Sequence, residues 1–416
     1  MDPQEAAAIE ALAPFRVRSF RFQWPADLAT SWAFEMEALI LGWYILVETG
    51  SVESLVLFAS LAWLGSLFSP FFGIAGDRLG FRTLLYATRA AYAVFAGVLA
   101  VLAFTQALRP WHVFTIAALV GVIRPSDMML RQVLVAQTMQ PHLLMGALAV
   151  ARTTGDTARI AGALAGTASV ALIGMGPAYA IVTALYVASF VLSLGVAGSA
   201  PARGTSATKT LAGLKAAVGY VWRMPEQLGA FSIAFLVNLL AFPFFLGLLP
   251  YVAKDVYAIG QTGLGYLAAS WASGALVGSL VVGGGRMRLA AGRVMLVSGV
   301  VWFLAILLFG QTHTLWIGLA LLFTAGVAQS FCMTPLAAVM LRSASDEMRG
   351  RVMGMRMLAV WGLPLGLLIA GPVIQHWGYT ATTVIYSVLG LAATFATAWR
   401  WRGALWSAAA PANVHP

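Results

Sequence analysis

The stretch Gly73–Leu85, GIAGDRLGFRTLL, is a short charged segment between two long apolar runs. The runs, near residues 54–75 and 83–106, are each long enough to cross about 30 Å of hydrocarbon at about 1.5 Å per residue. Glycines permit a tight backbone turn, and charged side chains keep the turn in water. The stretch therefore predicts a cytoplasmic hairpin between two membrane helices. Its glycines and charged residues are Gly73, Gly76, Asp77, Arg78, Gly80 and Arg82.

The composition of the whole chain is that of a membrane protein. Of the 416 residues, 60% are apolar and 10% are charged, against about 45–50% and about 25% in soluble domains. The first apolar run is too long for a cleaved signal peptide, and its leader, with Asp2, Glu5 and Glu10, is too acidic. Apolar runs recur along the chain and predict an all-α integral membrane protein with twelve spans. The spans are expected near residues 23–47, 54–75, 83–106, 111–136, 147–172, 177–198, 227–251, 262–283, 293–310, 314–340, 350–373 and 379–399.

The placement of the basic residues predicts how the spans are oriented. The formal net charge is +10, and such an excess in a soluble protein would suggest a nucleic-acid partner. Here Arg and Lys concentrate in alternate connections between spans, whereas the other connections contain only Arg109 and Lys254. By the positive-inside rule, both termini are expected to be cytoplasmic, in a multi-pass protein of the inner (plasma) membrane. The excess charge then reflects topology and contact with membrane lipid, and no nucleic-acid partner is expected.

The sequence contains no catalytic or cofactor-binding pattern. The only cysteine, Cys332, lies within an apolar run, and none of the five histidines has the spacing of a metal ligand. A phosphate-binding lysine loop is absent, so ATP hydrolysis is not expected. We therefore expect no catalytic residue, metal or cofactor. The chain is expected to act as a monomer.

A polar segment rich in small residues, Ser199–Gly213, divides the chain into two similar halves. Pro125 and Pro335 occupy corresponding places in the predicted fourth and tenth spans, and Gly76-Asp77-Arg78 corresponds to Gly285-Arg286-Met287-Arg288. Parallel repeats of this kind imply a substrate site between two bundles that rock against each other. The predicted regions are a lead-in at residues 1–22, a six-helix bundle at 23–198, a cytoplasmic linker with a short amphipathic helix at 199–226, a second six-helix bundle at 227–400 and a tail at 401–416.

The spacing of the glycines and of Gly76-Asp77-Arg78 in the charged loop resembles the loop between the second and third helices of the major facilitator superfamily. The resemblance implies twelve helices in two pseudo-symmetric six-helix bundles, transport by alternating access, and a gating role for the six loop residues named above. Phe81 stands where the family commonly has a base. The partner of the loop aspartate would therefore have to be Arg82 or Arg131.

Two further segments resemble proton-coupled exporters of this superfamily. Arg159–Thr167 is similar to the glycine-proline motif in the fifth helix of antiporters, with Gly162 and Gly166 in place. The same two glycines, four residues apart, are equally well explained as a close helix-packing face. Asp346–Gly354 resembles a turn in bacterial exporters related to the enterobactin exporter and to macrolide efflux proteins. These resemblances imply export of a drug, siderophore or other metabolite.

Charged residues inside the predicted spans are concentrated in the first half of the chain, although each costs at least about 2.5–3.5 kcal/mol at the bilayer centre. Glu35 and Arg124 lie nearest the middle of their spans, and Arg124 resembles a fourth-helix arginine of many antiporters. Either Glu35 or Glu37 is the expected proton carrier, because the two point to opposite sides of one helix. Spacing also predicts the ion pairs Asp127–Arg131 and Arg152–Asp156–Arg159, which are purely structural in the alternative interpretation. The proton-coupling candidates are Asp27, Glu35, Glu37, Arg124, Asp127 and Asp156.

Aromatic and polar side chains of the spans are candidates for a broad apolar substrate cavity. In the alternative interpretation each of them faces lipid or packs within its bundle. The favoured function is proton-coupled export of amphipathic small molecules. A lysophospholipid flippase that opens sideways to the bilayer, a proton-coupled importer and a transport-inactive membrane scaffold stay open as alternatives. The cavity candidates are Trp32, Asn238, Phe242, Gln329 and Trp361.

Overall fold

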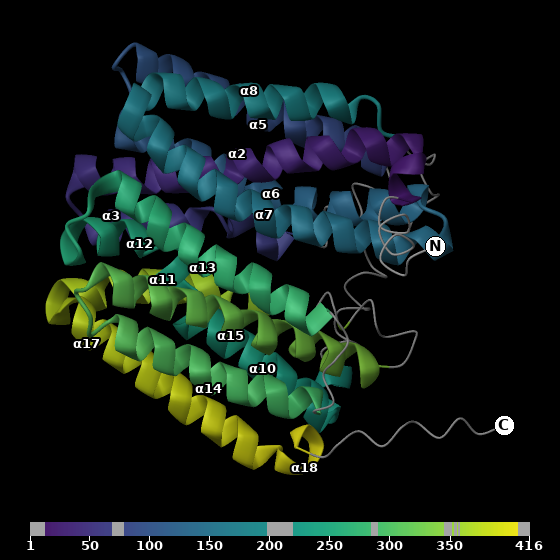
Figure 1. The fold of residues 1–416 in the computed structure, drawn as a ribbon, viewed down its shortest axis with the longest axis vertical. Coiled ribbons are helices and arrows are strands. Elements are labelled where there is room, and N and C mark those ends of the chain that lie inside the picture. Colours follow the sequence, from purple (N-terminus) through teal and green to yellow (C-terminus); the bar gives the residue numbers. More distant parts are fainter. Residues whose placement is uncertain are drawn as a thin grey trace. The chain divides into compact units, whose positions relative to one another are not determined.

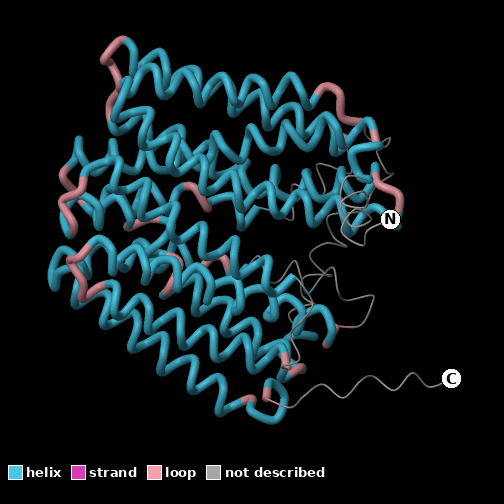
Figure 2. The backbone as a smooth tube through the Cα atoms, in the orientation of Figure 1, coloured by secondary structure: helices cyan, strands magenta, loops and turns pink. Residues whose placement is uncertain are grey.

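A computed structural model describes residues 13–68, 79–197, 219–283, 290–344, 352, 356 and 358–406. Within these ranges every regular element is helical (Figure 2), which confirms the predicted all-α fold. Several predicted features lie outside the described residues. They are Gly73, Gly76, Asp77 and Arg78 of the charged loop, most of the linker at 199–226, most of the segment Asp346–Gly354, and the tail beyond residue 406.

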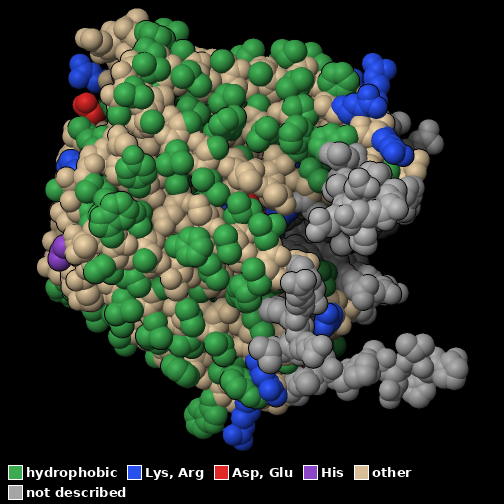
Figure 3. Space-filling model, viewed as in Figure 1, with side chains coloured by type: hydrophobic (Ala, Val, Ile, Leu, Met, Phe, Trp, Pro, Cys, Tyr) green, Lys and Arg blue, Asp and Glu red, His purple; other side chains and the backbone are tan. Residues whose placement is uncertain are grey.

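Seven of the described helices are long and apolar enough to cross a membrane. They expose large apolar side chains, such as Trp316 (77% exposed) and Trp399 (75%), and hydrophobic side chains are spread over much of the surface drawn in Figure 3. Such a surface requires lipid rather than water as its solvent. The seven helices are α5 (Phe81–Phe104), α6 (Pro110–Thr138), α8 (Met175–Ser193), α13 (Gly260–Gly283), α14 (Ala291–Phe309), α15 (Leu315–Arg342) and α17 (Gly362–Arg400).

Two more long helices, α2 (Arg18–Thr49) and α7 (Pro141–Ile173), match the predicted first and fifth spans. A short 3-10 helix, η1 (Ala13–Arg16), precedes α2, whose first residues belong to the predicted lead-in. α2 ends at Gly50, whose left-handed backbone (φ 62°) directs its N–H to the Leu46 carbonyl. Ser51 then caps the next helix by accepting a hydrogen bond from the backbone N–H of Ser54 at 3.2 Å.

The predicted second and seventh spans are interrupted helices rather than continuous ones. α3 (Val52–Leu61) is followed by the 3-10 helix η2 (Leu64–Phe68), with a break at Ala62–Trp63. A Cβ on Gly65 would lie 2.0 Å from the carbonyl oxygen of Val122, so η2 and α6 touch backbone to backbone. In the seventh span, Pro243 lacks the N–H that would continue the helix. The pieces of that span are α10 (Pro225–Leu240), α11 (Pro243–Leu246), α12 (Leu249–Tyr251) and the π-helical turn η3 (Val252–Val256).

α17 contains the end of the predicted eleventh span and the whole of the twelfth. Gly378 separates the two parts with a backbone conformation (φ 80°, ψ 167°) that is not helical and that glycine adopts readily. The chain therefore bends sharply at this residue. A last short helix, α18 (Arg402–Leu405), follows in the predicted tail.

Contacts divide the chain into two compact units, residues 1–207 with 250–269, and residues 208–249 with 270–416. In the first unit, α2 packs against α6, α7 and α8, and α5 packs against α6 and α8 (Figure 1). In the second unit, α14 packs against α15 and α17, and α10 packs against the same two helices. The predicted boundaries of the bundles and linker stay a prediction.

The two units differ in the polar groups that they bury. Buried residues of the first unit include charged ones, among them Glu37, Arg89 and Asp127. In the described part of the second unit the buried polar residues are uncharged, for example Gln227 and Asn238. The concentration of intramembrane charge in the first half of the sequence therefore corresponds to buried charge in one unit only.

Gly80, the last glycine of the charged loop, directly precedes α5 in a conformation that other residues avoid (φ 87°, ψ 132°). We expect Gly80→Ala to destabilise the protein by about 1–3 kcal/mol, because a Cβ is strained at this φ. Thermal unfolding of the purified protein in detergent measures the change. Gly155→Ala on α7 is the control, because a Cβ there meets nothing within 4 Å and alanine favours a helix. Equal stability of the two variants would contradict the prediction.

Candidate functional site

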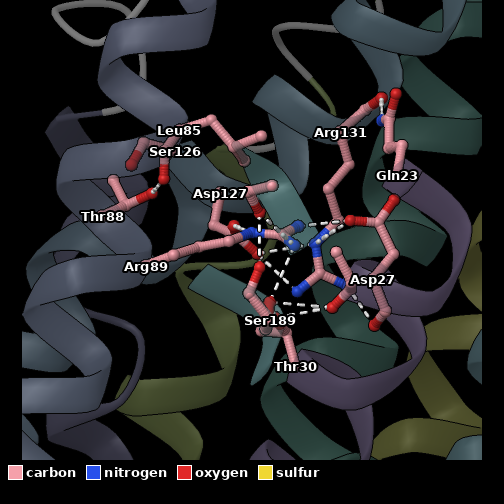
Figure 4. Close-up of polar contacts among 12 residues, drawn as sticks. Gln23, Asp27, Thr30, Leu85, Thr88, Arg89, Ser126, Asp127, Arg131 and Ser189 are labelled. Carbon is pink, nitrogen blue, oxygen red and sulfur yellow. Dashed lines mark hydrogen bonds and ion pairs between the residues drawn. The ribbon is translucent and has the colours of Figure 1, made fainter. Parts of the chain in front are cut away.

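Four charged side chains from three helices form a buried charge cluster in the first unit (Figure 4). Asp27 comes from α2, Arg89 from α5, and Asp127 and Arg131 from α6. Arg131 Nη2 lies 2.5 Å from Asp127 Oδ2, and Arg89 Nε lies 3.5 Å from Asp127 Oδ1. Asp27 pairs with Arg89, and its Oδ1 lies 3.7 Å from Arg131 Nε. Two carboxylates and two guanidinium groups therefore balance each other.

Hydroxyl groups add further hydrogen bonds to the charge cluster. Arg89 Nη1 donates to Ser189 Oγ on α8 at 2.8 Å, and Arg131 Nη1 donates to Ser31 Oγ on α2 at 2.8 Å. Asp127 is 0% exposed and Arg89 is 1% exposed. Buried charges persist only when they are paired and hydrogen-bonded. The charge cluster therefore ties α2, α5, α6 and α8 together, in agreement with the structural interpretation of these residues.

Glu37 forms a second polar site, between α2 and α8. Its Oε1 accepts a hydrogen bond from the Tyr179 hydroxyl at 2.9 Å, and its Oε2 accepts one from the Tyr186 hydroxyl at 2.7 Å. Phe34 packs edge to face on Tyr92 and Tyr186, with ring centroids 5.0 and 5.7 Å apart. Aromatic side chains thus surround Glu37, and both of its carboxylate oxygens are engaged.

Glu35 faces α7 instead, and it is more accessible. Its Oε1 lies 3.3 Å from Arg159 Nε, and the two side chains are 26% and 30% exposed. Arg159 Nη1 also lies 3.6 Å from Asp156 Oδ1, and Arg152 Nε lies 3.3 Å from Asp156 Oδ2. The ion pairs predicted from spacing on α7 are therefore confirmed, and Glu35 joins them from α2. Glu35 and Glu37 point to different helices, as their positions on α2 predict.

Arg124 occupies the midpoint of α6, where its guanidinium group stacks on aromatic rings. Its Cζ lies 4.8 Å from the ring centroid of Phe34 on α2 and 5.3 Å from that of Trp63. Trp63 belongs to the break between α3 and η2. Cation–π contacts of this kind contribute about 0.5–2 kcal/mol each, so the two rings hold the guanidinium plane in place.

The structure sorts the six coupling candidates into three sites. Asp27 and Asp127 belong to the charge cluster, and Glu35 and Asp156 both pair with Arg159. Arg124 and Glu37 share the third site, because Phe34 contacts both Arg124 and the tyrosine cage of Glu37, which is formed by Tyr179 and Tyr186. The sequence did not identify Arg89, Tyr179 or Tyr186 as site residues. Their partners lie 62, 142 and 149 positions away, so helical spacing carries no signal for them. The rarity of arginine inside a span was the only available indication of Arg89.

The two glycines of the antiporter-like segment lie against α2. A Cβ on Gly162 would be 2.8 Å from Glu35 Cβ, and a Cβ on Gly166 would be 2.7 Å from Met36 Cα. Trp32, one of the cavity candidates, also borders Gly162, at 3.0 Å from the same Cβ position. The glycines therefore form a close packing face that sets the distance between Glu35 and α7.

Of the six glycines and charged residues of the charged loop, Gly80 and Arg82 lie within the described residues. Arg82 contacts the Tyr86 hydroxyl, and its Nη2 donates to the Leu194 carbonyl at 3.3 Å. Arg131, the other expected partner of Asp77, is held in the charge cluster. Asp77 itself lies outside the described residues, so its pairing with a basic side chain and the gating role of the loop stay predictions.

The other cavity candidates all belong to the second unit. Asn238 is buried in α10 and its Nδ2 donates to the Ala234 carbonyl at 2.8 Å. Phe242, at the break after α10, packs edge to face on Trp302 with ring centroids 5.0 Å apart. Gln329 Oε1 and Trp361 Nε1 are buried without a hydrogen-bond partner among the described residues. Packing within the second unit accounts for the positions of Asn238 and Phe242 as well as a role in lining a cavity would.

No metal site is present in the described part of the chain, where no group of three or more His, Cys, Asp or Glu side chains could hold an ion. Cys332 is buried within α15 as a free thiol. The expectation that transport needs no cofactor stays a prediction.

Comparison with known proteins gives a family and several similar structures. Residues 28–358 match the family described as Major Facilitator Superfamily. The nucleoside transporter NupG has a TM-score of 0.74 and 16% sequence identity, over 92% of this chain and 99% of that chain. A D-xylose-proton symporter gives 0.72 and 14%, over 92% and 98%, and the human organic anion transporter MFSD10 gives 0.64 and 17%, over 91% and 99%. No curated protein sequence matches. At these identities the structural likeness shows the fold alone.

Proposed function

The chain belongs to the Major Facilitator Superfamily, and from this premise of a multi-pass secondary transporter we propose that it exports amphipathic small molecules in exchange for protons. It acts by alternating access, as a monomer in the inner (plasma) membrane with both termini in the cytoplasm. It needs the proton gradient and no cofactor, and its partners are its substrate and membrane lipid rather than nucleic acid. Export rests on the resemblance of Asp346–Gly354 to bacterial exporters.

The accessible ion pair between Glu35 and Arg159 is the observation that supports proton coupling. A proton carrier has to meet water and has to be stabilised in both charge states. Glu35 is 26% exposed and its partner Arg159 is 30% exposed, whereas the oxygens of Glu37 are occupied by tyrosines. When Glu35 takes up a proton, Arg159 still has Asp156 as a partner at 3.6 Å. Glu35 is therefore the carrier in this proposal.

We expect Glu35→Gln to uncouple transport from the proton gradient. The glutamine cannot release a proton, but it can hydrogen-bond Arg159, so the fold is retained. Proteoliposomes with an acidic lumen and a panel of fluorescent amphipathic dyes of both charges measure the effect. The unsubstituted protein is expected to accumulate dye against its gradient, and the Glu35→Gln variant to perform only downhill exchange.

Glu37→Gln is the matched control, because it changes the same atoms two residues away on the same helix. It is expected to keep gradient-driven accumulation. If Glu35→Gln still accumulates dye, the carrier role moves to another carboxylate. If the unsubstituted protein loses dye from an acidic lumen, it is a proton symporter, that is, an importer. Movement of a fluorescent lysophospholipid alone would favour the flippase alternative.

The described end of the charged loop fits a gate in this proposal. Arg82 contacts Tyr86 on its own helix and the Leu194 carbonyl at the end of α8. Arg82 thereby connects the described end of the loop to α5 and α8, which is the arrangement that the proposed gating role requires. Loss of interconversion rate without loss of substrate affinity in Asp77→Asn would support this role, and an equal loss of affinity would contradict it.

A further inference from the structure

Arg124 differs from the other described arginines within the spans of the first unit. Arg89 and Arg131 pair with the two aspartates of the charge cluster. Arg152 and Arg159 pair with Asp156 on α7, and Arg159 also pairs with Glu35. Among the described residues, no carboxylate forms an ion pair with Arg124. Both carboxylate oxygens of Glu37 on α2 are hydrogen-bonded by tyrosines instead. The guanidinium N–H groups of Arg124 are therefore available.

The position of Arg124 makes an unpaired charge costly. It lies midway along α6 (Pro110–Thr138), so its charge is far from both ends of the helix. Stacking on Phe34 and Trp63 recovers only part of the cost of a charge at the bilayer centre. A charge kept under these conditions indicates a function, and a positive charge with free donors calls for an anion.

The surroundings of Arg124 are suited to receive such a group. The rings of Phe34 and Trp63 lie against the guanidinium at 4.8 and 5.3 Å, and Arg124 itself is only half-buried. Trp63 lies at the break between α3 and η2, and non-helical backbone at membrane depth occurs where it is enclosed by protein or lines a cavity. The guanidinium is therefore held in place while its N–H edges can form two parallel hydrogen bonds to two oxygens of one anionic group.

We propose that Arg124 binds the anionic group of the transported molecule, which makes the substrates aromatic or otherwise amphipathic organic anions such as carboxylates and sulfonates. The rings of Phe34 and Trp63 contact the apolar body of the substrate next to its charge. This inference rests on the proposed transport function and narrows its substrate class. A membrane potential that is negative inside favours the outward movement of an anion, which agrees with export.

Binding of three probes with the same aromatic body tests the proposal. The probes are naphthoate, the neutral naphthamide and the cationic naphthylmethylamine, titrated by calorimetry into the purified full-length protein in nanodiscs. The unsubstituted protein is expected to bind naphthoate most tightly. Arg124→Gln should weaken the binding of naphthoate about 10- to 100-fold and leave the affinity for naphthamide unchanged, because only the charged hydrogen bonds are lost.

Two further variants separate charge recognition from effects on folding. Arg124→Lys keeps the charge but loses the paired N–H groups, so it should weaken the binding of naphthoate less than Arg124→Gln does. If Arg124→Gln does not fold, a loss in Arg124→Lys that is confined to naphthoate still supports the proposal. Arg223→Gln, which removes an exposed arginine, should leave all three affinities unchanged.

Several results would overturn the assignment. They are absence of naphthoate binding, equal binding of the three probes, or an equal loss of naphthoate and naphthamide in the Arg124 variants. The measurement needs no proton gradient, so it is independent of the coupling proposal. Naphthoate binding through Arg124 without proton movement would reject the proton coupling alone. If transport is driven by protons but the substitutions of Arg124 leave the affinity for naphthoate unchanged, the present inference alone is rejected.

Discussion

Asp127→Asn is expected to destabilise the protein by about 3–5 kcal/mol. The change removes a fully buried carboxylate that lies 2.5 Å from Arg131 and 3.5 Å from Arg89. Two guanidinium groups would then share the single charge of Asp27 inside the first unit. Arg89, which is 1% exposed, cannot reach the surface by a small movement, and Arg131 is only 17% exposed. The loss should be seen as a lower unfolding temperature in detergent and a lower yield of folded protein.

Asp156→Asn is the matched control for this prediction. Asp156 is also a buried aspartate that bonds an arginine four residues away on its own helix. Its partner Arg152 is 63% exposed, and its second partner Arg159, 30% exposed, keeps Glu35 as a partner, so neither guanidinium is left buried and unpaired when the carboxylate is lost. The expected destabilisation is about 0–1 kcal/mol, the range of exposed ion pairs. Equal losses in the two variants would show that enclosure of the arginines does not determine the effect.

The double variant Asp127→Leu with Arg131→Met tests the cause of the loss. It removes one charge of each sign and leaves the pair between Asp27 and Arg89. Replacing a buried ion pair with apolar side chains of similar size is often neutral or stabilising. The double variant should therefore be more stable than Asp127→Asn, a non-additivity that is characteristic of directly interacting residues.

The sequence was sufficient to predict the fold, because the apolar runs and the distribution of arginine and lysine depend only on local composition. It did not reveal the breaks at Ala62–Trp63 and after Leu240. The first break accompanies a backbone contact between η2 and α6 at Gly65. Such a contact does not change the periodic pattern of apolar residues in the sequence. Pro243 was a visible signal for the second break, although prolines inside membrane helices often only bend them.

The sites were predictable only where both partners lie on one helix. The pairs Asp127–Arg131 and Arg152–Asp156 follow from four-residue spacing, and both are present. The bond from Arg89 to Asp27 and the tyrosine cage of Glu37 join helices that are distant in sequence. The pattern of apolar and polar residues does not determine how two helices are rotated against each other. Those contacts could therefore be identified only from the structure.

The two glycines on α7 have a meaning that the motif resemblance alone did not give. Gly162 and Gly166 resemble an antiporter segment, but in the structure they let α7 touch α2 beside Glu35 and Met36. In the proposed mechanism these glycines would act through geometry, because their close contact with α2 sets how far Arg159 on α7 lies from Glu35.

Gly166→Val is expected to separate α7 from α2 and to impair both stability and coupling. A Cβ at this position would lie 2.7 Å from the Cα atom of Met36, so the clash is with backbone and cannot be relieved by a side-chain rotation. Overpacking of this kind typically costs about 1–3 kcal/mol. The shift would also lengthen the 3.3 Å contact between Arg159 and Glu35. Thermal unfolding and gradient-driven dye accumulation measure the two effects.

Gly155→Val on the same helix distinguishes this clash from the intrinsic cost of valine in a helix. A Cβ on Gly155 meets nothing within 4 Å, so that variant should keep both stability and coupling. If Gly166→Val also keeps them, α7 does not depend on its close approach to α2. If it loses stability but accumulates dye normally, the distance between Glu35 and Arg159 does not control proton exchange. Loss of both properties, with Gly155→Val unaffected, would connect helix packing at Gly166 directly to the carboxylate that we assign as the proton carrier.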